Sequence, residues 1–279
     1  MLHIMNGYDR MMLALDREIP DTVPIFEILG EHLREQLCPG KPLPDPLEEG
    51  RLESLREMVK RFKGRKAIVF AVWSSFIYPS FLRGFEHYLM DFFDNPEFVL
   101  EINERFSRYY EKQIYAAEEI GADCIMESED FCGKTGPFMS LSHFKEFCMP
   151  GLKIVSKAAK HAGLKFIKHS DGYVWPLLDC LIGELQADAY HPSEPVAGMD
   201  IRKVKEVYGD RTCVIGNIDC SHLLPFGTEK EIEDAVRQCV EENKPGGGYI
   251  LSSSNCVHAA IPLKNLLAMI RAGRTYGKY

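Results

Sequence analysis

Short apolar runs alternate with amphipathic, helix-like segments along most of this chain, and this alternation is the feature that most limits its fold. The runs with strand character are residues 23–29, 67–73, 123–126, 165–168, 188–190, 212–215 and 248–251. Glycines such as Gly121, Gly163 and Gly209 mark turns between the segments. Apolar strands that are each followed by a helix are typical of a parallel sheet covered on both faces. The pattern therefore predicts an α/β fold.

A (β/α)8 TIM-type barrel that spans residues 1–279 as one domain is the architecture that this order favours. Seven strands can be placed, and the eighth is expected near the N-terminus or within residues 39–46. A doubly wound open sheet is the alternative, but no Gly-x-Gly-x-x-Gly or Walker-type phosphate loop follows any predicted strand. Residues 37–49, with four prolines, are predicted to form an irregular spacer rather than a lid.

Composition and charge exclude several classes of protein. With 279 residues and 46% hydrophobic composition, the chain can bury one large core. A formal net charge of −8 argues against nucleic acid as a partner, because phosphate binding needs a basic face. We expect no membrane helix, and a cytoplasmic protein, because long apolar runs and a secretion-signal layout are both missing from the sequence. Nine cysteines without a Cys-x-x-Cys pair argue against a disulfide framework.

Polar side chains gather where the predicted strands end, which is where barrel enzymes place their chemistry. In chain order they are Glu27, Glu127, Glu129, Asp130, His169, Asp171, His191, Glu194, Asn217, Asp219, Cys256 and His258. A set that is rich in imidazole, carboxylate and thiol and poor in cations suits a divalent metal better than a phosphate. We therefore predict a zinc site in which His169 and Cys256 are ligands and Glu194 or Asp171 completes the set.

The strand that ends at His169 lets Asp171, two residues later, point the same way. Asp171 is then a metal ligand, a partner that fixes the histidine tautomer, or a helix cap, and we favour the last two roles. In the acidic cluster, alternation sends Glu127 and Glu129 to one side of the strand and Asp130 to the other. One of these three is predicted to handle the substrate or a proton, because paired carboxylates in a half-buried mouth raise the pKa of one of them.

Several segments of the chain resemble the uroporphyrinogen decarboxylase superfamily. They are residues 10–15 with 20–24, 82–86 with 90–97, 192–200 (PSEPVAGMD), 207–219 (VYGDRTCVIGNID) and 262–269. These segments cover nearly the whole chain in the order that the superfamily shows. The resemblance implies a (β/α)8 barrel.

Within this superfamily, the porphyrinogen decarboxylases carry an Arg-Gln-Ala-Gly-Arg motif after the first strand, and its arginines hold the substrate carboxylates. Residues 26–32 (FEILGEH) are acidic at that position and would repel a polycarboxylate. The corrinoid-linked methyltransferases instead carry a His-x-Cys motif and a distal cysteine that bind zinc, and a glutamate that approaches the metal. His169, Cys256 and Glu194 match these positions, whereas Asp171 stands where the first cysteine would be.

The aspartate makes the site richer in oxygen, which disfavours activation of a thiol. The resemblance therefore implies a methyltransferase that moves a methyl group between a small methylated substrate, with an aryl methyl ether favoured, and the cobalt of a corrinoid (cobalamin) on a separate protein. The predicted zinc ligands are His169, Glu194 and Cys256, and the predicted catalytic groups are Glu127, Glu129, Asp130 and Asp171. A metal-free lyase acting on a tetrapyrrole or a related acid is the alternative, and a non-catalytic corrinoid-binding barrel is a third. The sequence also allows a homodimer.

Overall fold

Six strands form one parallel sheet in the order β1-β2-β5-β6-β7-β8. The computed structural model describes residues 5, 7–23, 45–48 and 50–279. The strands are β1 (Val69–Val72), β2 (Cys124–Ser128), β5 (Lys165–His169), β6 (Ala189–His191), β7 (Cys213–Ile218) and β8 (Tyr249–Ser253). All six strands predicted from residue 67 onward are therefore confirmed. Residues 24–29 of the first predicted strand, with Glu27, lie outside the described residues, as do 26–32 and most of 37–49.

α-Helices lie between most successive strands of the sheet, whereas β5 and β6 are joined by short 3-10 and π-helical segments. The α-helices are α1 (Gly7–Leu15), α2 (Gly50–Phe62), α3 (Ile77–Arg83), α4 (Phe85–Asp94), α5 (Pro96–Ile120), α6 (Leu141–His143), α7 (Met149–His161), α8 (Ile201–Tyr208), α9 (Leu223–Phe226), α10 (Glu229–Asn243) and α11 (Leu263–Tyr276). Short π-helical and 3-10 segments occupy Phe144–Cys148, Trp175–Leu177, Asp179–Glu184 and Pro195–Ala197. Although α5 spans 25 residues, neither it nor any other described helix combines the length and apolar character of a membrane span.

Local sequence explains where the longest helices begin and end. Helix α5 begins with Pro96 in its first turn, where a missing N–H costs nothing, and it ends at Gly121 in the left-handed conformation. At the start of α10, the Thr228 side chain accepts from the Glu231 N–H and the Glu231 carboxylate accepts from the Thr228 N–H. This reciprocal capping satisfies backbone donors that would otherwise lack partners.

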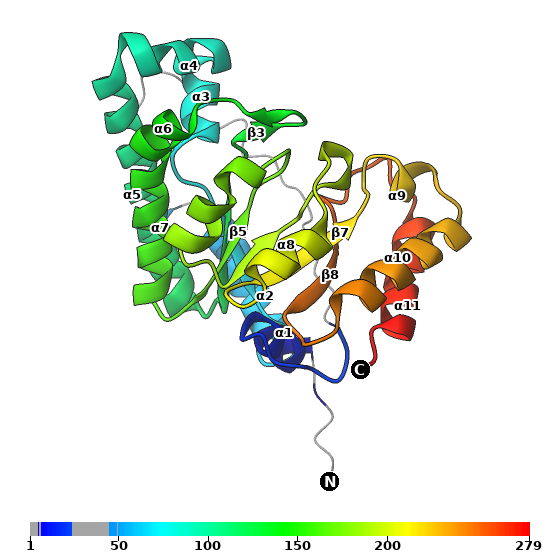
Figure 1. Ribbon diagram of the computed structural model, residues 1–279. Coiled ribbons are helices and arrows are strands. Elements are labelled where there is room, and N and C mark those ends of the chain that lie inside the picture. The colour runs from blue at the N-terminus through cyan, green and yellow to red at the C-terminus, as the bar shows by residue number, and fades with distance from the viewer. Residues whose placement is uncertain (1–4, 6, 24–44, 49) are drawn as a thin grey trace.

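Helices cover the outer face of the sheet. In Figure 1, α5 and α7 lie side by side against one half of the sheet, and α10 and α11 pack together beside β7 and β8. The outer face contributes Ile125, Phe166, Tyr190 and Val214 to the main hydrophobic core. Burial of these side chains between sheet and helices is the main force that holds the two layers together.

A second, smaller core lies on the inner face of the sheet. Met11, Ala14 and Leu15 of α1 pack there against side chains from the first halves of the strands, which are Cys124, Met126, Ile167, Ala189, Cys213, Ile215 and Ile250. Figure 1 shows α1 below the sheet, at the end where the strands begin. Helix α1 therefore covers the amino end of the inner face, and the carboxyl end is left for polar residues.

The arrangement is that of a (β/α) barrel, with a helix layer outside and a separate core inside. Over the described residues the barrel is not closed, and β1 and β8 form the two edges of the sheet. A two-stranded antiparallel hairpin, β3 (Cys132–Gly133) and β4 (Gly136–Pro137), follows β2 at the carboxyl end. This hairpin packs on Gly172, where a Cβ would lie 2.6 Å from the Cys132 carbonyl oxygen. It therefore contacts the chain just beyond β5.

Candidate metal site

The register of the sheet brings two histidines side by side at its carboxyl end. His169 is the last residue of β5 and pairs in register with His191, the last residue of β6. Ile167 and Ala189, two residues before them, belong to the inner core. Because side chains two residues apart on a strand share a face, both imidazoles point to the inner side.

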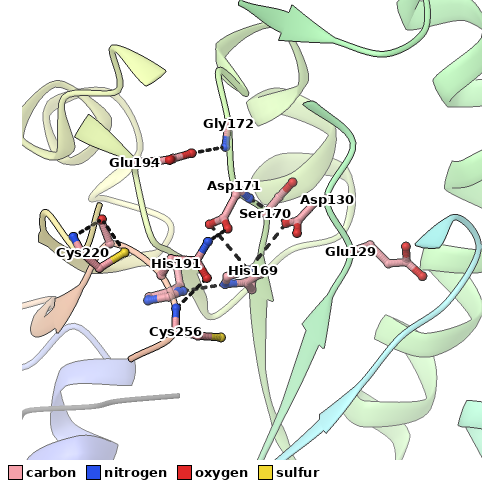
Figure 2. A network of polar contacts seen from close by, with 12 residues as sticks. Glu129, Asp130, His169, Ser170, Asp171, Gly172, His191, Glu194, Cys220 and Cys256 are labelled. Carbon is pink, nitrogen blue, oxygen red and sulfur yellow. Dashed lines mark hydrogen bonds and ion pairs between the residues drawn. The ribbon is translucent and has the colours of Figure 1, made fainter. Parts of the chain in front are cut away.

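Two aspartates join His169 in one cluster. The His169 Nε2 lies 3.6 Å from an oxygen of Asp130 and 3.6 Å from an oxygen of Asp171. Among the residues that the structure describes, this is the group whose His, Cys, Asp and Glu ligand atoms all lie within 4.8 Å of one another. The Asp171 N–H also donates to the Asp130 carboxylate at 2.8 Å, so the two strand exits are tied together. Figure 2 shows both carboxylates directed at His169.

Asp171 is supported from β8 and caps no helix. Its Oδ2 accepts a hydrogen bond from the Asn255 amide, whose oxygen in turn accepts from the Cys256 N–H at 2.6 Å. The other carboxylate oxygen of Asp171 is buried and has no hydrogen-bond partner. The 3-10 segment that follows has no side-chain cap. Asp171 is thus held by one oxygen while the second faces the imidazole.

The electrostatics of the cluster favour a cation. Burial raises the pKa of Asp171 well above its ordinary value, and the charges of Asp130 and Glu194 add to the rise. Burial also raises the pKa of Asp130. The pKa of His169 falls to about 3, because burial and the charge of Lys168 both disfavour the imidazolium. A neutral imidazole is a good metal ligand, and a divalent ion would relieve the repulsion between the two carboxylates.

The donor set fits a zinc-like ion. It offers one imidazole nitrogen and two carboxylate groups, and the unpartnered oxygen of Asp171 is the kind of buried atom that a cation satisfies. Two oxygens and one nitrogen form a harder set than the sulfur-rich one that the resemblance implies.

The cluster opens into a cavity of about 750 Å³. Asp130, His169, Asp171, Asn255 and Cys256 form its polar end, and the remaining wall comes mainly from β1 and α2, including Leu55, Met58, Phe70 and Trp73. Arg51 also lines it, with its guanidinium 4.9 Å from the Trp73 ring centre. An apolar wall that faces a small group of polar side chains suits a small, largely apolar ligand.

The two predicted glutamates lie elsewhere. Glu127 is buried on the outer face, where it pairs with Lys168 and accepts from the Ser74 hydroxyl at 2.7 Å. Glu129 accepts the backbone N–H groups of Ser74 and Ile77 at 2.8 and 2.5 Å, at the start of α3. Burial, with the charge of Glu127, raises the pKa of Glu129 to about 8. Asp130 points the other way, as alternation predicts, and the catalytic role of the two glutamates stays a prediction.

The other predicted site residues occupy the rim. Glu194 accepts the Gly172 N–H at 2.9 Å, and Figure 2 shows it on the side of the cluster away from Cys256. Cys256 lines the cavity and is partly buried. Neither belongs to the group of converging ligand atoms, so their role as ligands stays a prediction. Asp219 accepts backbone N–H groups at the start of α9.

Two residues at the site were not predicted as metal ligands or catalytic groups. His191 donates to or accepts from His169, with their Nδ1 atoms 2.7 Å apart. Asn255 holds Asp171 across a separation of 84 residues. Both follow predicted strands, so their position was a usable signal, but the pairing itself depends on the sheet register.

Comparison with known proteins identifies the family. The uroporphyrinogen decarboxylase (URO-D) family matches residues 34–276, which is most of the chain. The chain belongs to the URO-D family. No curated protein matches the sequence of this chain. The predicted resemblance to this superfamily is confirmed.

Solved structures support the fold of this URO-D family member. A methyltransferase from Methanosarcina mazei superposes with a TM-score of 0.81 at 17% identity, covering 98% of this chain and 99% of that one. A 3-keto-D-glucoside 4-epimerase from E. coli gives a TM-score of 0.50 at 12% identity, covering 81% and 85%. At these identities the likeness concerns the fold, and it confirms the predicted TIM-type barrel class.

Proposed function

We propose that this URO-D family member is a methyltransferase that moves a methyl group between a small methylated substrate and the cobalt of a corrinoid carried by a separate protein. The observation that carries the proposal is the cluster of Asp130, His169 and Asp171 at the carboxyl ends of the strands, open to a largely apolar cavity. His169 and Cys256 also match positions that bind zinc in the methyltransferases of this superfamily. The fold of the Methanosarcina mazei methyltransferase is in keeping with this assignment.

Zinc is the metal that we propose for the site, with Asp130, His169 and Asp171 as the residues that hold it. When bound, zinc supplies Lewis acidity that polarises the heteroatom from which the methyl group leaves. Glu194 and Cys256 are proposed as further ligands, since both lie beside the cluster.

The rest of the site binds and orients the substrate. The Asn255 amide holds one oxygen of Asp171, so that the other stays directed at His169. Phe70 and Trp73 belong to the apolar lining of the cavity, and the Arg51 guanidinium lies over both rings. An aryl methyl ether fits this division, because its ring is apolar and its ether oxygen is the one polar atom at the reacting end. We therefore propose aryl methyl ethers as the first substrate class.

Metal analysis of the purified protein is the first test. We expect about one zinc per chain, lost in His169→Ala and Asp171→Ala. His258→Ala is the matched control. His258 follows β8 as Asp171 follows β5, but it contacts the Cys220 carbonyl instead of the cluster. Zinc retained in both cluster variants, or lost equally in the control, would contradict the site.

A reduced corrinoid protein supplied with a methoxylated aromatic tests the reaction class. We expect a change in the corrinoid absorption spectrum that needs both the enzyme and the methyl donor. A protein that carries no metal and releases CO2 from a porphyrinogen acid would instead support the lyase alternative. Association with the corrinoid protein without any spectral change would support a binding-only role.

A further inference from the structure

His169 and His191 form a hydrogen bond between two imidazoles, both of them buried. Their Nδ1 atoms are 2.7 Å apart, and the two rings are tilted by 25° with centres 4.9 Å apart. The exposed fraction is 5% for His169 and 0% for His191. A hydrogen bond between two ring nitrogens needs one that carries a proton and one that does not. The Nε2 of His169 faces the aspartates, and the direction of this bond decides whether that nitrogen is left without a proton.

The far nitrogen of His191 settles that direction. Its Nε2 lies 3.3 Å from the main-chain carbonyl oxygen of Ser253 and 3.4 Å from the Ser252 hydroxyl. A hydroxyl can donate or accept, but a carbonyl oxygen only accepts. The proton on His191 is therefore placed at Nε2 by the hydrogen-bond network, because a bare Nε2 would set two lone pairs against each other.

His191 holds one proton and not two. Its side chain has no exposed surface, and its two ring nitrogens face another imidazole and a carbonyl oxygen, so a second proton would bury a positive charge between neutral groups. With the proton at Nε2, its Nδ1 is an acceptor. His169 then donates from its own Nδ1, so its neutral ring, the form that binds a metal, carries its proton there. The Nε2 of His169 is left bare.

We propose that His191 is a positioning residue that, through the Ser253 carbonyl, fixes the tautomer of His169 and presents a bare Nε2 to Asp130 and Asp171. Three acceptors then converge, namely this nitrogen and one oxygen from each carboxylate. Such a group can ligate a cation, and a metal ligand is commonly oriented in this way by a partner at its other nitrogen. The inference deepens the proposed metal site but concerns a tautomer that exists before metal binds.

Nitrogen-15 NMR of metal-free protein labelled at histidine tests the tautomer directly. We expect His169 to carry its proton on Nδ1 and His191 on Nε2, with resonances assigned by His169→Gln and His191→Gln. A His169 signal with the proton on Nε2 would overturn the proposal. Because this reading needs neither zinc nor activity, it stands even if the proposed methyltransferase function fails.

Substitution of His191 supplies a second test, with zinc alone as the probe. His191→Phe removes the acceptor, so we expect mixed tautomers at His169 and a zinc affinity lowered roughly 10–100-fold. His191→Gln retains a side-chain oxygen that can accept from Nδ1 and is expected to restore most of the affinity. A glutamine variant that binds zinc as poorly as the phenylalanine variant, while both melt as the parent does, would contradict the role. If neither variant nor parent binds zinc, the metal site is wrong and the NMR result still decides the tautomer.

Discussion

Lys168 and Glu127 form an ion pair in which neither side chain has any exposed surface. The two lie on neighbouring strands β2 and β5, on the outer face of the sheet. Lys168 also donates to the main-chain carbonyls of Glu129 and His169. Its ammonium therefore joins the carbonyl group of the residue before Asp130 to the carbonyl group of the histidine ligand itself. Burial raises the pKa of Glu127, and the charge of Lys168 opposes that rise.

Lys168→Met is predicted to destabilise the protein by about 3–5 kcal/mol, because it leaves the Glu127 carboxylate buried without its partner. The double variant Lys168→Met, Glu127→Leu removes both charges and is expected to recover much of that loss. Urea unfolding of the two variants and the parent measures the difference. A double variant that is no more stable than the single one would show that the destabilisation by Lys168→Met does not come from leaving the Glu127 charge unpaired.

Asn255→Leu is predicted to weaken zinc binding roughly 10–100-fold, because the amide that holds Asp171 is lost. The fold is expected to remain intact, since the side chain lies at the cavity and not in either core. Titration with zinc and a competing chelator measures the affinity. Asn217→Leu is the control, because Asn217 also lies near the carboxyl end of a strand, β7, but donates to the Ser193 carbonyl. Equal losses in both variants would argue against a specific role for Asn255.

The strands of this protein could be predicted because each is a short apolar run with turn residues at its ends. The face of the sheet on which a side chain lies could be predicted as well, since alternation separates Glu127 and Glu129 from Asp130. His169 was recognisable at a strand end. What could not be predicted is which strand exits meet.

The site depends on pairings that cross large distances in the chain. The bond between Asp171 and Asn255 spans 84 residues, and the His169–His191 contact requires that the two strands end in register. A local sequence pattern gives neither the contact between residues far apart in the chain nor the register of two strands. For the same reason, the sequence did not indicate that Asp130 lies beside His169 and Asp171. The burial of Lys168 and Glu127 was equally hidden, because charged residues near a strand end normally face water.

Gly172→Ala is predicted to cost more than Gly163→Ala. Both glycines have a positive φ, at +83° and +71°, where an alanine costs about 1–2 kcal/mol. At Gly163 nothing lies within 4 Å of the added Cβ, whereas at Gly172 it would meet the Cys132 and Gly133 carbonyl oxygens at 2.6 and 2.7 Å. We expect an additional ~1–3 kcal/mol at Gly172, since the hairpin must move. Thermal unfolding of both variants measures this, and equal costs would contradict the tight packing.

The metal-free protein is predicted to gain stability from Asp171 as the pH is lowered. Burial and neighbouring carboxylates raise the pKa of Asp171 in the folded protein above its unfolded value of about 3.9. Such a group contributes stability that is fully present below the unfolded pKa and is lost as the pH rises through the folded pKa. Asp171→Asn cannot titrate, so it should be more stable than the parent at neutral pH, with the difference shrinking in acid.

Urea unfolding of the chelated parent and of Asp171→Asn between about pH 5 and pH 8 measures this linkage. Zinc should reverse the trend in the parent, because it binds the deprotonated carboxylates and its affinity rises with pH. Parallel stability curves for the two chelated proteins would show that Asp171 does not titrate in this range.

Helix α1, which packs Met11, Ala14 and Leu15 under the inner face, has a kinetic consequence. It covers the end of the sheet opposite to His169, so the converging polar side chains lie at the carboxyl end. A small substrate and a large protein partner that both act at His169 would meet at this same end of the sheet. The small molecule must then enter before the large one docks, and its product must wait for the large one to leave. Steady-state kinetics would show this as a compulsory order of binding.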